Sequence, residues 1–150
     1  MPNRLTKGRA LLGSTSIDRD LDVRGDATFH GATAGLRSQY LAKSADHAVT
    51  AAESGATFVN TKGSGSTVFS LPATVAGLVY TFLESNASGE ITVRPVAADK
   101  IMGGGLTALD DKDVVNTGGT NAVGDLVTLI GDGADGWWIT HKVGTWARES

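Results

Sequence analysis

The chain has no cysteine, few aromatic residues and few charges. Among its 150 residues, aromatic side chains account for 6% and charged side chains for 19%. The absence of cysteine excludes disulfide bonds and thiolate metal ligands. Because Gly, Ser and Thr are plentiful instead, the composition favours strands and turns over helical packing. Stability therefore has to come from the packing of one core or from association with other chains.

A long apolar run is also missing from the beginning of the chain. Residues 1–12 include Arg4, Lys7 and Arg9 but no continuous apolar stretch. A signal peptide needs an apolar stretch of about 7–15 residues, and a membrane-spanning helix needs about 20. We therefore expect a protein that is made in a cytoplasm and does not enter a membrane.

The sequence does contain a series of short strand-like segments separated by Gly, Asp and Asn. Each carries β-branched or aromatic residues at alternate positions, which is typical of half-buried strands. Residues 78–83 are apolar at nearly every position, as expected of a central strand covered on both sides. The segments are residues 57–60, 67–71, 78–83, 91–94, 126–130 and 137–141. They predict an all-β fold, an antiparallel β-sandwich or jelly-roll-like domain over residues 54–150, with an extended N-terminal arm.

Residues 1–35 have the pattern of that arm. The apolar residues lie at odd-numbered positions, namely Leu21, Val23, Ala27 and Phe29. In an extended strand they would point to one side, which gives one apolar and one polar face. An isolated strand cannot bury such a face. We expect its cover to be another copy of the arm or the surface of another protein.

Residues 36–53 carry the only helix-like spacing in the chain. Apolar residues, several of them Ala, recur there near helical periodicity, while Ser44, Asp46 and Thr50 interrupt the pattern. This segment is interpreted as a linker with two or three helical turns, joining the arm to the β domain.

Charge is distributed unevenly along the chain. Residues 1–48 contain seven Lys or Arg against five Asp, whereas residues 49–150 contain six against eleven acidic residues. A net charge of +2 is too weak for a nucleic-acid-binding tail, which needs a clustered basic patch. An arm that lies on a mildly acidic protein surface fits the distribution better.

The acidic residues near the C-terminal part raise the question of an ion. Asp125, Asp132 and Asp135 surround the turn at residues 131–136 and supply the oxygen ligands that calcium prefers. The spacing lacks the pattern of an EF-hand loop, and a hairpin turn with Asp-Gly pairs explains the same residues. The sequence is therefore compatible with a bound calcium ion and with a metal-free hairpin turn. The acidic residues of the segment 110–113 are expected to form a solvated loop.

No residue pattern points to catalysis. His30, His47 and His141 are scattered, without a Ser-His-Asp order or a His pair at metal-ligand spacing. The glycines at residues 103–105 are followed by neither Lys-Ser nor Lys-Thr, so a phosphate-binding loop is not indicated. We expect a protein that is not an enzyme and that needs no cofactor.

Two adjacent tryptophans are open to two interpretations. Side chains of neighbouring strand residues point to opposite faces, so one of Trp137 and Trp138 is expected to fill the core. The other then faces solvent, a neighbouring subunit or a ligand, and an exposed Trp can stack on a sugar ring.

Several of these segments together resemble a known kind of domain. They are residues 52–60 (AESGATFVN), 68–73 (VFSLPA), 77–82 (GLVYTF), 136–139 (GWWI) and 144–146 (GTW). The set is similar to a domain that recurs in virion proteins of tailed bacteriophages, both capsid decoration (cement) proteins and fibre proteins. Residues 21–31 (LDVRGDATFHG) similarly resemble the short strand repeats of phage fibres.

The resemblance implies a homotrimer that projects from a virion, attached through its arm. Since the chain ends soon after Trp146, we expect a decoration protein on the capsid surface, assembled in the bacterial cytoplasm and bound to the major capsid protein. A fibre or adhesin domain that binds host glycan is the alternative; neither nucleic acid nor membrane is an expected partner. The residues expected at capsid or subunit interfaces are Arg4, Lys7, Arg9, Arg19, Leu21, Val23 and Phe29.

Overall fold

The computed structural model describes residues 38–117 and 119–149. The chain divides into two units, Met1–Leu36 and Arg37–Ser150, and the described residues belong to the second. They contain strands, one 3-10 turn η1 (Ala51–Glu53) and no α-helix. The strands are β1 (Tyr40–Lys43), β2 (His47–Ala48), β3 (Thr57–Asn60), β4 (Gly65–Ser70), β5 (Val79–Glu84), β6 (Gly89–Arg94), β7 (Lys100–Gly103), β8 (Val114–Asn116), β9 (Leu126–Gly131), β10 (Gly136–Val143) and β11 (Ala147–Arg148).

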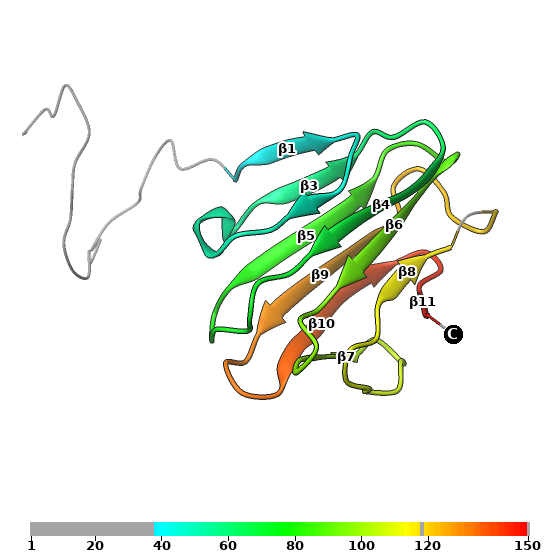
Figure 1. Cartoon of the computed structure of the whole chain (residues 1–150). Helices are drawn as coiled ribbons and strands as arrows, with labels where there is room; N and C mark the ends of the chain where they lie inside the picture. Colours follow the sequence, from blue (N-terminus) through cyan, green and yellow to red (C-terminus); the bar gives the residue numbers. More distant parts are fainter. Residues whose placement is uncertain (1–37, 118, 150) are drawn as a thin grey trace, which may run out of the picture. The chain divides into compact units, whose positions relative to one another are not determined.

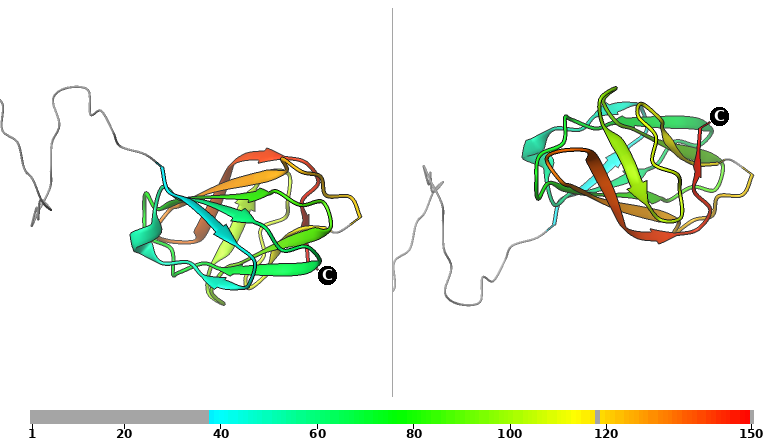
Figure 2. Two further views of the ribbon diagram at one scale, coloured as in Figure 1. Left: turned by 90° about the horizontal axis from the view of Figure 1, so that it is seen from above. Right: turned by 90° about the horizontal axis from the view of Figure 1, so that it is seen from below.

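These strands form a β-sandwich, which confirms the predicted all-β class. A six-stranded sheet has the order β1-β3-β5-β9-β10-β7, and a five-stranded sheet has the order β11-β8-β6-β4-β2 (Figure 1). The views from above and from below show the two sheets packed face to face (Figure 2).

Both sheets are mixed, which differs from the antiparallel arrangement that the sequence predicted. From β1 to β6 the chain crosses to the opposite sheet after every strand. Each strand therefore returns to its own sheet in the same direction, so β1, β3 and β5 are parallel, and so are β2, β4 and β6. Antiparallel pairing begins with β8, β9 and β10. The tight hairpin turn expected at residues 131–136 is confirmed, and it joins β9 to β10.

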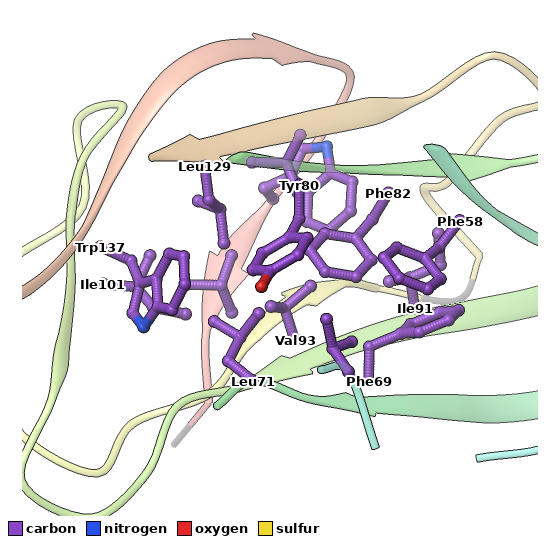
Figure 3. Close-up of a cluster of buried hydrophobic side chains, with 14 of the residues drawn as sticks. Phe58, Phe69, Leu71, Tyr80, Phe82, Ile91, Val93, Ile101, Leu129 and Trp137 are labelled. Carbon is purple, nitrogen blue, oxygen red and sulfur yellow. The ribbon is translucent and has the colours of Figure 1, made fainter. Parts of the chain in front are cut away.

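The core is a row of aromatic rings between the sheets. Phe58 on β3 and Phe82 on β5 lie side by side in the parallel register, and their rings stack with centroids 5.5 Å apart. Phe69 reaches the same point from the opposite sheet, 5.0 Å from Phe82. Tyr80 and then Trp137 continue the row (Figure 3). All five side chains are fully buried, so this row holds the two sheets together.

The β domain begins earlier than predicted. Residues 36–53, interpreted from sequence as a partly helical linker, instead provide β1, β2 and the single turn η1. The physical reason lies in the pairing partners: β1 joins β3, and β2 joins β4, each as an edge strand. Leu41 on β1 packs against the core cluster. Tertiary pairing has overridden the helical propensity of the alanines.

The acidic segment 110–113 is only partly a solvated loop. Asp113 is buried, and its Oδ2 lies 2.9 Å from a guanidinium nitrogen of Arg94 on β6. The hydrogen bonds that Arg94 donates to Asp113, followed by the negative charge of Asp113, raise the pKa of Arg94. Asp113 therefore ties the start of β8 to β6, whereas Asp110 and Asp111 are exposed.

Candidate functional site

Trp137 and Trp138 occupy opposite faces of β10. Trp137 is fully buried in the core, so it is not an exposed contact. Trp138 lies on the outer face of the six-stranded sheet with 47% of its surface exposed. Its indole Nε1 donates a hydrogen bond of 3.3 Å to Oδ2 of Asp132. A flat ring held at a fixed angle is suited to contact a subunit or a sugar.

Asp132 also shapes the turn between β9 and β10. Its Oδ1 accepts hydrogen bonds from the backbone N–H groups of Ala134 at 2.8 Å and Gly136 at 2.9 Å. The bond from Gly136, and next the bond from Ala134, hold the pKa of Asp132 below its ordinary value of 3.8. The carboxylate thus anchors the turn on one side and the Trp138 ring on the other.

This geometry predicts how the turn responds to acid. Because the folded pKa of Asp132 is lowered, the carboxylate's contribution to stability is complete above the unfolded value and is lost as pH falls through the folded value. An NMR titration is therefore expected to place the Asp132 midpoint below 3.8, with the Trp138 indole N–H signal moving in the same step. A midpoint at or above the ordinary value, or an indole signal that does not follow it, would contradict this geometry.

The three aspartates considered as calcium ligands do not converge. Asp125 and Asp132 flank opposite ends of β9, and a strand of this length separates its ends by about 17–20 Å. Asp125 is buried and its Oδ2 accepts bonds of 3.0 Å from Asn116 Nδ2 and the Ala122 N–H. Within the described ranges, no group of three His, Asp or Glu residues is arranged to hold a metal ion.

His47 and Glu53 form a pair that the sequence did not indicate. The Nε2 atom of His47 lies 2.9 Å from Oε1 of Glu53, and Oε2 of Glu53 accepts the Thr50 N–H at 2.8 Å. Burial raises the pKa of Glu53, but the bonds from Thr50 and His47 lower it overall. Tyr80 Oη donates to the Thr50 carbonyl at 3.0 Å. Since one carboxylate oxygen of Glu53 holds the start of η1 and the other contacts His47 on β2, the pair acts as a structural tie.

A fully buried polar cluster surrounds Glu84. Asn60 and Glu84 are neighbours in the β3–β5 register, and Asn60 Nδ2 lies 2.9 Å from Glu84 Oε2. Oε1 of Glu84 accepts the Asn86 N–H at 3.0 Å, while Thr67 Oγ1 donates to Asn60 Oδ1 at 2.9 Å. These bonds satisfy a fully buried carboxylate. The cluster joins the loops at one end of the sandwich and offers no free base.

The arm residues singled out from the sequence lie outside the described residues. They are Arg4, Lys7, Arg9, Arg19, Leu21, Val23 and Phe29. In the part of the chain that is described, no helix is long and apolar enough to cross a membrane.

The strongest candidate contact among the described residues is therefore Trp138 with the sheet face around it. The chain matches no protein-family model and no curated protein sequence.

Proposed function

We propose that this protein is a structural component of a tailed-phage virion, a capsid decoration protein that binds the outside of the head as a homotrimer. The observation that carries the proposal is the resemblance of residues 52–60, 68–73, 77–82, 136–139 and 144–146 to such proteins. Strands β4, β5 and β10 contain parts of segments 68–73, 77–82 and 136–139, respectively. Segment 52–60 spans η1 and β3. The similar segments thus make up the frame of the domain.

The use of the buried carboxylates supports a structural role. Glu84, Asp113 and Asp125 all accept hydrogen bonds from groups of the same chain. Glu53 does so as well. A general acid or base has to reach a substrate proton, whereas these groups are committed to turns and strand ends. In the part of the chain that the structure describes, these groups stabilise the sandwich.

In this proposal the arm attaches the protein to the shell. Residues 1–48 carry the net positive charge, while residues 49–150 carry net negative charge. Arg4, Lys7, Arg9 and Arg19 bind acidic rims of the major capsid protein, and the apolar residues Leu21, Val23 and Phe29 add a contact between subunits. Bridging neighbouring capsid subunits adds binding free energy that internal DNA pressure has to overcome.

Deleting residues 1–30 tests this division of roles. The truncated protein is expected to fold, because the sandwich has a core of its own, but to lose attachment to undecorated heads in a co-sedimentation assay. Heads without the protein should release DNA at a lower temperature than decorated heads. Full occupancy by the truncated protein would show that attachment runs through the β domain.

The exposed ring of Trp138 favours one alternative, a fibre-type adhesin that stacks a host glycan on this residue. Virions with Trp138→Ala distinguish the two functions. For a decoration protein we expect unchanged adsorption to cells and less stable heads, because the ring contributes to a subunit contact. Reduced adsorption with heads of normal stability would instead support the adhesin.

A further inference from the structure

Lys43, Asn60 and Glu84 stand side by side at the ends of three neighbouring strands. Each is the last residue of its strand, β1, β3 and β5 respectively. In the parallel register, Lys43 pairs with Asn60, and Asn60 pairs with Glu84 (Figure 1). Asn60 and Glu84 are fully buried. Lys43 lies two residues after Leu41, which packs against the core, so its side chain points to the same inward side of the sheet.

The amine of Lys43 is in reach of the Asn60 carboxamide. Neighbouring strands lie about 4.8 Å apart, and the four-carbon stem of lysine is flexible. Lys43 is partly buried, and within the described part of the chain its ammonium group bonds to no other group. The ammonium of Lys62 is also close to Asn60 in the sequence, but it is bonded to the Ser66 carbonyl. Lys43 is therefore the amine that is available to Asn60.

The carboxamide of Asn60 is held between two donors and a carboxylate. Its Oδ1 accepts hydrogen bonds from the Lys62 N–H at 3.1 Å and from Thr67 Oγ1 at 2.9 Å. Two donors aimed at this oxygen stabilise negative charge that develops on it, as in an oxyanion hole. Its Nδ2 lies 2.9 and 3.2 Å from the two carboxylate oxygens of Glu84. The carbonyl is thus polarised, and the amide nitrogen already contacts a group that can carry a proton.

We propose that Lys43 and Asn60 form an isopeptide bond inside the domain, with Glu84 as the proton carrier. Glu84 is too deeply buried to serve an external substrate, but it contacts the one nitrogen that has to leave. The bond ties β1, an edge strand of four residues, to β3. Since the chain has no cysteine, this linkage supplies a covalent tie between strands that a disulfide cannot. The inference does not depend on the proposed role in a virion.

The step balances in atoms and charge. Glu84 first takes a proton from the Lys43 ammonium, which leaves both groups uncharged, as a buried site favours. The lone pair of Nζ then attacks Cγ of Asn60 and forms the new C–N bond, while the carbonyl π electrons move to Oδ1. As the carbonyl re-forms, the bond from Cγ to Nδ2 breaks, and a proton passes from Nζ to the leaving nitrogen. The released ammonia takes up the proton held by Glu84, so ammonium leaves and the carboxylate is restored.

Mass spectrometry of the purified full-length protein tests the proposal. We expect the wild type, measured unfolded, to weigh less than its sequence by one ammonia. Trypsin should then leave residues 38–62 together as one peptide with the same mass deficit, because it does not cut after a linked Lys43. Lys43→Arg and Glu84→Gln should restore the full mass. Lys62→Arg, the matched control, should keep the deficit.

Four results would overturn the proposal. The first is a wild type of full mass. The second is a deficit in a peptide that trypsin still cuts after Lys43, since an asparagine that cyclises onto its own backbone also loses ammonia. The third is a deficit that persists in Lys43→Arg, which assigns the linkage to another amine, and the fourth is one that persists in Glu84→Gln, which removes the proton carrier. If a variant does not fold, fragmentation of the wild-type peptide decides, because a linked loop yields no fragment ions from cleavage between residues 43 and 60.

Discussion

Replacing Phe69 by alanine is expected to lower the free energy of unfolding of the β domain by about 3–5 kcal/mol, the usual cost of removing a buried Phe side chain. Phe69 is fully buried, and its ring lies 5.7 Å from Phe58 and 5.0 Å from Phe82. Together with His47, whose ring lies 5.4 Å from Phe58, it brings the five-stranded sheet into contact with the aromatic row of the other sheet. Its loss leaves a cavity at the centre of the core that rigid strands on both sides cannot fill.

The neighbouring residue is a matched control for this prediction. Val68 precedes Phe69 on β4, points outward and is only partly buried. Val68→Ala is expected to cost about 1 kcal/mol or less, mostly through strand propensity. Urea denaturation followed by fluorescence measures both variants. Equal losses for Phe69→Ala and Val68→Ala would mean that the two sheets do not pack through this row.

Gly136→Ala is the second substitution for which we expect a large effect, a loss of about 3–5 kcal/mol from backbone strain and broken ladder bonds. Gly136 has a φ of 142°, a region that side chains disfavour. A Cβ built there would lie 2.1 Å from the Lys100 carbonyl oxygen and 2.5 Å from its nitrogen. Because Gly136 pairs with Lys100 where β10 meets β7, the two strands would have to separate.

Gly105→Ala separates the steric part of this effect from the conformational part. Gly105 also has a positive φ, 82°, but a Cβ there meets nothing within 4 Å. The control is therefore expected to lose only about 1–2 kcal/mol. In Gly136→Ala, hydrogen exchange should in addition become faster for the amides of β7. Full protection of β7 in that variant would contradict the close approach of the two backbones.

The strands that the sequence predicts well are those rich in β-branched and aromatic residues and bounded by turn residues. The segments 78–83, 91–94 and 126–130 all coincide with strands of the structure. The tight turn before Trp137 was equally evident, since Asp-Gly pairs are typical of hairpins.

The elements that the sequence did not reveal depend on partners far away in the chain. Strands β1 and β2 are short, and their alanines favour helix, but each pairs with a strand about twenty residues later. Asp113 is buried only because Arg94 lies opposite. The parallel pairing of β1 to β6 follows from crossovers between sheets, and local patterns carry no information about crossovers.

For the same reason, only part of the candidate site could be predicted from the sequence. Strand alternation required that one of Trp137 and Trp138 be buried, but only the register of β10 with β9 and β7 shows which.

The most direct test of the proposed function is a cryo-electron microscopy reconstruction of virions that carry this protein. We expect density for three β-sandwiches around a threefold axis on the outer surface of the head, connected to the major capsid protein through the N-terminal arms. Density for the protein only in the tail, or heads that lack it altogether, would contradict the assignment as a capsid decoration protein.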